Sequence, residues 1–407
     1  MTWLPELYRR ARRRLAWVSD RVAEATDRTL LNTLGAPPWI AALAGPALRV
    51  VGGAAAWTRL PPRLPVSVLE SGEVRLTLHG PEADAPWLAD ALGLADPAVR
   101  PVRRHLTLLG GRRLSADIPA SGWFVGALPR GAGALGARPR STYCVTTLSN
   151  VGHLVDLAVP FTLQGGERKK LRQSLARLDH VTLQAEFTRS RDDFRHFHEQ
   201  LYRPHIARRH GTRAVLVEAN RQWAQWFGRG GGLLLLRVDG IAAIGCIVHR
   251  TGRCVALVEE GLNEALAREP YFGALQAALK RAAIDWARTE GARLVYLGLS
   301  PAAASHGIYR SKRLWGARPI VPPRVMQPHW TFQAHALSAA DRYLFNSRRF
   351  VSIHAGRPVV VRVLAEDGTY DGPHRTDDDV ATDGLQGIVE VWPGRTRFRP
   401  LGKHDDE

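Results

Sequence analysis

The feature that most constrains the fold of this sequence is an apolar stretch over residues 232–260 that two turn signals divide into three parts. Asp239-Gly240 and Thr251-Gly252 are dipeptides typical of two-residue hairpin turns, because such turns need positive φ angles that glycine adopts at no steric cost. The three parts are therefore predicted strands of an antiparallel meander: Gly232–Val238, Ile241–Arg250 and Arg253–Glu260.

A long helix is predicted directly after the meander. Over Tyr271–Glu290 apolar residues recur at helical spacing on one broad face, and Gly291 predicts the end of the helix. A strand follows at Arg293–Leu297. Similar patterns on both sides predict helices at Gly165–Leu178, Arg191–Arg209, Val217–Trp226 and Gly307–Leu314, and strands at Val181–Phe187, Pro319–Val321 and Trp330–His335.

The 407 residues exceed one ordinary domain of roughly 100–200 residues, so we expect at least two. Short alternating runs predict strands in the first half, at Val66–Leu69, Glu73–Leu78, His105–Leu108 and Trp123–Leu128. The expected division is a basic helix and linker over 1–64, a strand-rich domain over 65–160, a catalytic domain over 161–365 and an acidic, flexible tail over 366–407. The GxGxxG at Gly131, Gly133 and Gly136 lies between prolines and is interpreted as a loop.

The charge of the chain favours anionic partners. The formal net charge is +18, and because residues 366–407 hold 11 acidic and 5 basic side chains, the residues before them carry +24.

No run of 18 apolar residues predicts a membrane span, and the N-terminus lacks the apolar core of a secretory signal. The three cysteines are too few for a disulfide framework. Counting back from the Thr251-Gly252 turn pairs Cys246 with Leu257, so Cys246 and Cys254 would face opposite sides of the sheet, which argues against a disulfide or a shared metal. We expect a cytoplasmic protein.

The first segment, Met1 to Asp27, is predicted to form a basic amphipathic helix. Trp3, Leu4 and Leu7 begin its apolar face, and five arginines lie between positions 9 and 14. One interpretation is a peripheral contact with the anionic inner face of the plasma membrane. The other is a helix packed on the protein with a solvated basic face.

Three stretches of the second half resemble GNAT acyltransferases, and more narrowly their FemAB-like branch. They are KKLRQSLARLDHVTLQAEF (Lys169–Phe187), FHEQLYRPHIARRHG (Phe197–Gly211) and YFGALQAALKRAAIDWARTEGARLVYLGLSPAAASHGIYRSKRLWGARP (Tyr271–Pro319). The resemblance covers roughly residues 160–334. It implies an α+β or α/β fold with a GNAT-like mixed sheet flanked by helices, in which Arg253–Glu260 and Arg293–Leu297 run side by side and splay. The strand-rich domain before it would be a smaller unit, with a degenerate GNAT copy as one interpretation.

The resemblance also implies acyl-CoA, acetyl-CoA in particular, as co-substrate without a metal. Its pyrophosphate would lie on backbone N–H groups at the start of the helix that follows Pro270. The candidate cofactor-binding residues are Arg268, Tyr271, Phe272, Gly273 and Ala274. This turn departs from the family's Gln/Arg-x-x-Gly-x-Gly/Ala pattern, so a capped core helix is the alternative.

Candidate catalytic groups lie at the end of the meander and on the closing helix. Acyl transfer needs a general base near the acceptor, and Glu259 and Glu260 end the third strand, where alternation turns one of the two inward. The resemblance places an acid or a charge-stabilising group on the closing helix, where Tyr309 and Lys312 lie. Solvated surface groups are the alternative for each.

The acceptor would bind beside the long predicted helix. The candidate substrate-binding residues there are Tyr202, Arg203, His205 and His210. The implied function is transfer of an acyl group to an amine or hydroxyl of a small-molecule or lipid-linked glycan acceptor of the cell envelope. An aminoacyl-tRNA-dependent transferase of the same fold and a non-catalytic, membrane-associated binding module are the alternatives.

Overall fold

The computed structural model describes residues 63–71, 74–79, 85–94, 98–107, 123–128, 142–161, 168–211, 214, 216–320, 329–355, 357–373, 380 and 384–401. The basic helix predicted over Met1–Asp27 and the glycine motif at Gly131, Gly133 and Gly136 lie outside the described residues.

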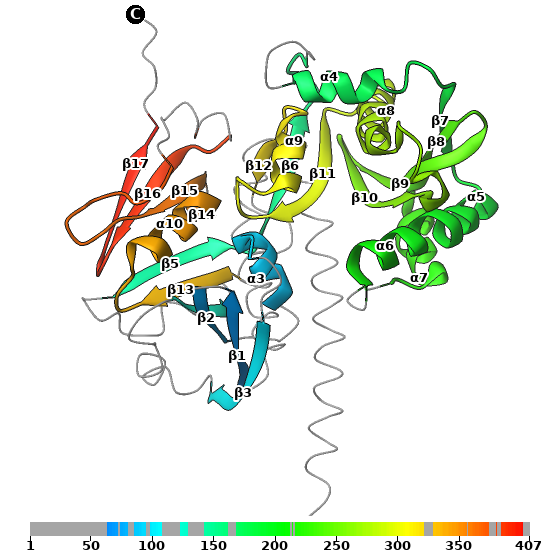
Figure 1. Ribbon diagram of the computed structural model, residues 1–407. Coiled ribbons are helices and arrows are strands. Elements are labelled where there is room, and N and C mark those ends of the chain that lie inside the picture. The colour runs from blue at the N-terminus through cyan, green and yellow to red at the C-terminus, as the bar shows by residue number, and fades with distance from the viewer. Residues whose placement is uncertain are drawn as a thin grey trace, which may run out of the picture.

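A six-stranded sheet, here the first sheet, is built mainly from the first half of the chain (Figure 1). Its order is β3-β1-β2-β4-β13-β5, with the helices α3 (Ala85–Leu92) and α10 (Ala339–Arg348) against it. The strands are β1 (Arg63–Ser71), β2 (Val74–His79), β3 (Ala98–Thr107), β4 (Trp123–Leu128), β13 (His329–Ala334) and β5 (Tyr143–Leu148). The four strands predicted in this half overlap β1 to β4.

A seven-stranded second sheet holds the predicted meander. Its order is β12-β6-β11-β10-β9-β8-β7, and it is mixed, because β10 and β11 are parallel while the other pairs are antiparallel. The strands are β12 (Arg318–Ile320), β6 (Asn150–Asp156), β11 (Leu294–Pro301), β10 (Cys254–Leu262), β9 (Ile241–Thr251), β8 (Gly232–Val238) and β7 (Leu183–Thr188).

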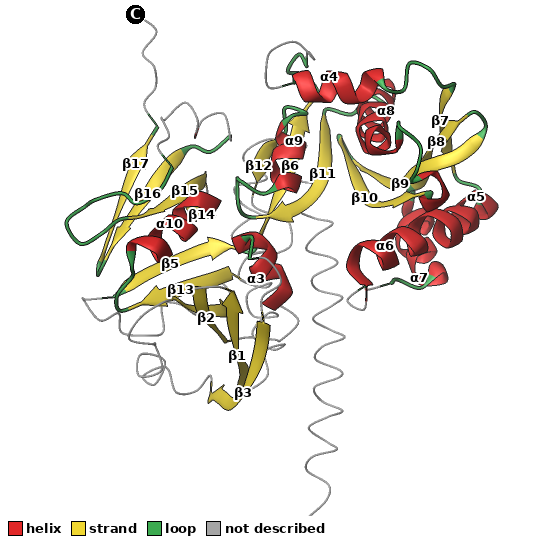
Figure 2. Cartoon of the chain, viewed as in Figure 1, coloured by secondary structure: helices red, strands yellow, loops and turns green. Residues whose placement is uncertain are grey.

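Helices cover both faces of the second sheet (Figure 2). Successive strand side chains point to opposite faces, and accordingly Leu233 and Leu235 of β8 pack with one helix group while Leu234 and Leu236 pack with another. The first group is α5 (Arg191–His196), the π-helix η4 (Phe197–Tyr202), α6 (Arg203–His210) and α7 (Ala219–Trp226). The second group is α4 (Lys169–Ala176) and α8 (Leu275–Thr289). This is the GNAT-like mixed sheet flanked by helices that the resemblance implied.

The helix predicted over Arg191–Arg209 contains a π-helical turn in its middle. That turn lies against the end of β10, where Gly261 permits a very close approach, since a Cβ there would lie 2.6 Å from the backbone nitrogen of Tyr202. The contact places the end of η4 beside the carboxylates that end β10.

The chain passes from one large sheet to the other at two places. β5 and β6 are separated only by Ser149, yet β5 belongs to the first sheet and β6 to the second. In the same way β12 lies in the second sheet and β13 in the first. The boundary expected at residues 160 and 161 therefore does not separate the sheets, because each contains a strand from the other half of the chain.

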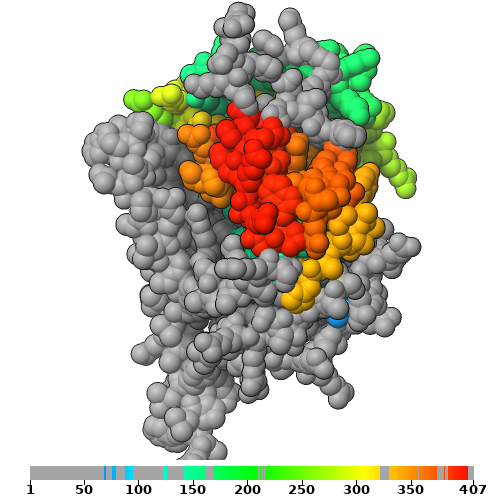
Figure 3. Space-filling view, turned by 90° about the vertical axis from the view of Figure 1, so that its left-hand side faces the viewer, coloured from blue at the N-terminus to red at the C-terminus, as the bar shows by residue number. Residues whose placement is uncertain are grey.

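A third sheet, with the order β14-β15-β16-β17, follows the helix α10 (Ala339–Arg348). Its strands are β14 (Val351–His354), β15 (Arg357–Val363), β16 (Gly387–Trp392) and β17 (Arg395–Pro400). β16 and β17, red in Figure 3, form an outer face of the molecule. The flexible tail expected from residue 366 differs from the structure here: Ile388, Val389 and Val391 pack into the core, which the acidic composition of the segment concealed.

Candidate functional site

A pocket opens where β10 and β11 separate. The two strands pair in parallel only at Cys254–Ala256 and Leu294–Tyr296, after which both carry a register irregularity: β10 against β9 between Leu257 and Glu259, and β11 against β6 between Tyr296 and Leu299. A bulge bends its strand, so the two ends diverge around a pocket of about 460 Å³. The expectation that these strands run side by side and splay is confirmed.

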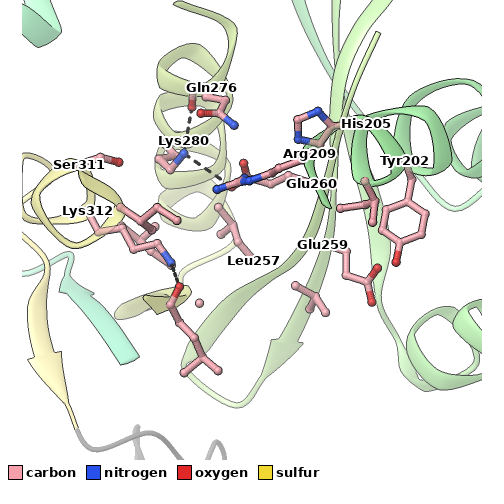
Figure 4. Close-up of a pocket in the computed structure, with 16 residues that line it drawn as sticks. Tyr202, His205, Arg209, Leu257, Glu259, Glu260, Gln276, Lys280, Ser311 and Lys312 are labelled. Carbon is pink, nitrogen blue, oxygen red and sulfur yellow. Dashed lines mark hydrogen bonds and ion pairs between the residues drawn. The ribbon is translucent and has the colours of Figure 1, made fainter. Parts of the chain in front are cut away.

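Side chains from several helices and strands line the pocket (Figure 4). They are η4, α6, β10, α8, β11 and α9 (Gly307–Arg313). The lining side chains that carry charge or a polar group are Tyr202, His205, Arg209, Glu259, Glu260, Gln276, Lys280, Ser311 and Lys312. Cations and carboxylates thus meet in one space.

Lys312 and Lys280 are the most deeply buried cations of the pocket. Only 8% of Lys312 is exposed, and its Nζ donates to the carbonyl oxygen of Leu299 at 2.6 Å. Burial lowers the pKa of Lys312 to about 7; the carboxylate of Glu260 opposes this, and the charges of Lys280 and Arg209 add to it. A lysine with this pKa exchanges its proton near neutral pH, which ordinary lysines do not.

Glu260 faces the α8 side of the pocket. Its Oε1 lies 3.6 Å from Nζ of Lys280, whose side chain is 8% exposed, whereas that of Glu260 is 26% exposed. In the ladder Glu260 is opposite Cys246, in place of the expected Leu257, because the turn lies at Gly252-Arg253, one residue later than predicted, and the β10 bulge adds one further position. The carboxylate is therefore held by a buried cation and remains open to the pocket.

Glu259 faces the other way, toward η4 and α7. Its Oε2 accepts a hydrogen bond of 2.5 Å from Nε2 of Gln222, which is fully buried. Burial raises the pKa of Tyr202, and the charge of Glu259 and a hydrogen bond to it raise that pKa further. The Tyr202 hydroxyl thus stays protonated and donates to Glu259, which makes Glu259 the more constrained of the two adjacent carboxylates.

The predicted acceptor-binding residues divide into two groups. Tyr202 and His205 line the pocket, and Nδ1 of His205 lies 2.9 Å from Oε1 of Glu264, which also pairs with Arg208. Arg203 and His210 lie on the same helix but are not among the pocket residues. Arg209, which the pocket does include, lies one residue before His210.

The predicted cofactor turn differs from its expected form. α8 begins at Leu275, after a 3₁₀ turn over Phe272–Ala274, and the N–H groups of Phe272 and Ala274 donate to the carbonyls of Glu269 and Tyr271. Two of the four N–H groups expected to hold a pyrophosphate are therefore already used within the turn, because 3₁₀ turns satisfy donors locally. Gly273 faces open space, as expected.

None of Arg268, Tyr271, Phe272, Gly273 and Ala274 lines the pocket, to which α8 instead contributes Gln276 and Lys280. Tyr271 and Phe272 pack against the core beneath α8. Tyr309 is fully buried in another cluster, with its ring edge-on to His153 at 4.9 Å, so it is turned away from the pocket that Lys312 lines.

Sequence reasoning missed Lys280 and Gln222. A signal for Lys280 was present, because only five lysines occur among 56 basic residues, and two of them, Lys280 and Lys312, line this pocket. Lysine loses its proton on burial far more readily than arginine, so a rare lysine in an arginine-rich chain indicates a site. Gln222 gave no comparable signal.

The sequence matches no family model and no curated protein. Among solved structures, it is similar to the C-terminal domain of a protein named as a lysylphosphatidylglycerol synthetase from Agrobacterium fabrum, with 15% identity, a TM-score of 0.34, and coverage of 69% of this chain and 87% of that chain. A structure named L-PGS from Bacillus licheniformis has 12% identity, a TM-score of 0.32, and coverage of 70% and 88%.

A tandem GNAT protein from the clavulanic acid biosynthesis pathway has 14% identity, a TM-score of 0.30, and coverage of 79% of this chain and 97% of that chain. We base the GNAT-like fold on the strand order and the splayed pair. In the described part of the chain, no helix is long and apolar enough to cross a bilayer.

Proposed function

We propose that this chain is an acyltransferase that moves an acyl group from acyl-CoA to an amine or hydroxyl acceptor. The observation that carries the proposal is the pocket between the splayed ends of β10 and β11, which contains both a cation that exchanges its proton near pH 7 and a carboxylate open to the pocket. Acyl transfer needs both kinds of group within reach of one carbonyl.

Three of the polar side chains of the pocket have roles in this reaction. Glu260 takes the proton of the acceptor amine as its nitrogen forms a bond to the acyl carbon. The carbon–sulfur bond then breaks, and Lys312 stabilises the negative charge that develops on the carbonyl oxygen and passes a proton to the leaving thiolate. Lys280 holds Glu260 in place at 3.6 Å.

Aminoacyl-tRNA is the second candidate donor. The specific observation in its favour is that the N–H groups of Phe272 and Ala274 are used within their turn, which weakens the expected pyrophosphate site. The charge of +24 before residue 366 also suits an RNA. Lys312 and Glu260 keep the same roles, since an ester replaces the thioester.

Thermal unfolding with acetyl-CoA, longer acyl-CoAs or charged tRNA distinguishes the donors. A ligand at 100 times its Kd adds about 2.7 kcal/mol of stability. Stabilisation by one class, together with transfer of its labelled acyl group to hydroxylamine, supports that donor. The control is Lys312→Met, which retains the pocket walls and is expected to bind the donor without transferring the label. If no donor binds, the proposal fails.

The acceptor class and the membrane contact remain proposals from the sequence. We propose a cell-envelope precursor, small or linked to a lipid, reached from the cytoplasmic face of the membrane through the basic segment Met1–Asp27. Co-sedimentation with anionic vesicles at low salt tests this contact. Equal binding by the full chain and by one lacking residues 1–27 would remove it.

A further inference from the structure

A fully buried histidine lies beneath the pocket. His153 is in β6, between β11 and β12, and its Nε2 is 2.8 Å from Oγ of Ser300. The Ser300 hydroxyl donates to the carbonyl of Pro301 at 3.1 Å. Because a serine has only one hydroxyl proton, it accepts from the histidine, and the proton of His153 is on Nε2.

The rest of the ring is held by packing. Nδ1 of His153 is buried without a hydrogen-bond partner among the described residues, and the ring meets that of Tyr309 edge-on. Burial lowers the pKa of His153, and the charges of Lys312 and Arg313 lower it further. The imidazole is therefore neutral, and its bond to Ser300 ties β6 to the end of β11.

That end of β11 also holds Lys312. The carbonyl that accepts from its ammonium belongs to Leu299, the residue before Ser300. One residue earlier, Gly298 has a φ of +77°, and a Cβ there would lie 3.6 Å from Nζ of Lys312. Leu297 and Gly298 form the irregular part of β11, and its pairing with β6 resumes at Leu299, opposite Gly152, so the bond between His153 and Ser300 lies where the ladder re-forms.

We propose that His153 is a positioning residue for Lys312: by donating to Ser300 it fixes the backbone at Leu299, whose carbonyl then holds the ammonium in the pocket. Its consequence for catalysis rests on the proposed function, but the geometry does not. Without the bond, the Leu299 carbonyl turns away and Nζ moves toward water.

Competitive labelling of the full chain with acetic anhydride tests this without any acyltransferase assay. Mass spectrometry of the Lys312 peptide across a pH series gives the midpoint of its titration. The charged groups facing Lys312, which are Glu260 from β10, Lys280 from α8 and Arg209 from α6, are left unchanged. His153→Leu and Ser300→Ala should each raise the midpoint by about one pH unit or more, because Nζ becomes better solvated.

Three comparisons make the result specific. His153→Gln retains an N–H donor at a similar reach and should restore a midpoint near that of the wild type. The double variant of His153→Leu with Ser300→Ala should shift no further than either single variant. Thr331→Val removes a buried hydroxyl from the first sheet and should leave the midpoint unchanged.

An unchanged midpoint in folded Ser300→Ala overturns the inference, and this small change keeps the test valid where His153→Leu fails to fold. Raised midpoints in a chain that transfers no acyl group leave the positioning role intact and refute the proposed function. Normal acyl transfer with unchanged midpoints refutes the positioning role and leaves the proposed function intact.

Discussion

In both large sheets a parallel strand pair lies beside a strand supplied by the other half of the chain. In the first sheet β2 and β4 are followed by β13 and β5, and in the second β10 and β11 are followed by β6 and β12. The pairs differ in how far they stay together. β2 and β4 remain paired to the end of β2 at His79, whereas β10 and β11 separate after three positions.

What fills the space differs as well. Against β4 the first sheet packs aromatic rings on one another: Trp123, Tyr143, Phe332, Phe345 and Phe350. At the matching place the second sheet has a pocket with two buried lysines. The same strand arrangement thus supports either a packed core or a site, and the choice depends on whether the bulges and charges are present.

The largest expected effect is on the stability of the first sheet. Trp123→Ala should lower the free energy of unfolding by about 3–5 kcal/mol, because it removes a ring that is only 1% exposed and leaves a cavity at the centre of the aromatic cluster. Urea denaturation measures the change. Transfer activity per folded molecule should not change, and a loss of activity in excess of the unfolded fraction would show that the packed pair also serves the site.

In the second sheet the corresponding change removes chemistry. Lys312→Met should lower the rate of acyl transfer about 10²–10³-fold, because the developing negative charge loses its nearest cation. The wild-type rate should fall as pH rises through about 7, where Lys312 loses its proton. Lys312→Arg remains charged and should abolish that decline, so a decline that persists in the arginine variant would assign it to another group.

Lys312→Met should also change how the free energy of unfolding depends on pH. In the folded chain the pKa of Lys312 is depressed to about 7. Between pH 7 and the ordinary pKa of a lysine, the unfolded chain therefore binds a proton that the folded chain does not. Wild-type stability consequently rises with pH over this interval. From pH 6 to pH 9 this gain is about 2.5 kcal/mol, and Lys312→Met should lack it. Urea denaturation at the two pH values tests this; parallel curves would contradict the buried state of the amine.

Neighbouring residues of α8 give the smallest contrast. Lys280→Met leaves Glu260 without its cation and should cost about 1–2 kcal/mol, a reduced value because Glu260 retains contact with water. Arg281→Met breaks a pair with Asp285 in which both side chains are about half exposed, and should cost less than about 0.5 kcal/mol. Equal losses in thermal denaturation would mean that the pocket pair is as solvated as the surface pair.

The elements of the second sheet could be predicted because each has a strong local signal. The Asp239-Gly240 turn lies between β8 and β9 as predicted, the turn between β9 and β10 is Gly252-Arg253, one residue after the predicted position, and the apolar face of α8 follows the predicted spacing. The bulge in β10 could not be predicted, since it depends on the splay and on the π-turn that packs against Gly261. Together with a turn that lies one residue later than predicted, it changed the partner of Cys246 from Leu257 to Glu260.

For the site, residue type was a better guide than helix position. Glu260 was predicted because adjacent carboxylates end the third strand of the meander, and Lys312 because the resemblance places a charged group on the closing helix; both line the pocket. The cofactor turn was placed by the resemblance at the helix start after Pro270, where the sequence does not distinguish a 3₁₀ turn from a helical one. The exchange of β6 and β13 left no local signal, because the pairing joins residues far apart in the chain.

The exchange also bears on how the chain is made. Thr146 of β5 lies 185 residues before Thr331 of β13, the residue it meets. At about 5–20 residues per second, a ribosome takes roughly 10–40 seconds to deliver the missing strand. During that interval the edges of β4 and β5 that later receive β13 stay unpaired in the nascent chain, where such edges invite aggregation. We therefore expect newly synthesised chains to need chaperone protection until residue 334 has emerged.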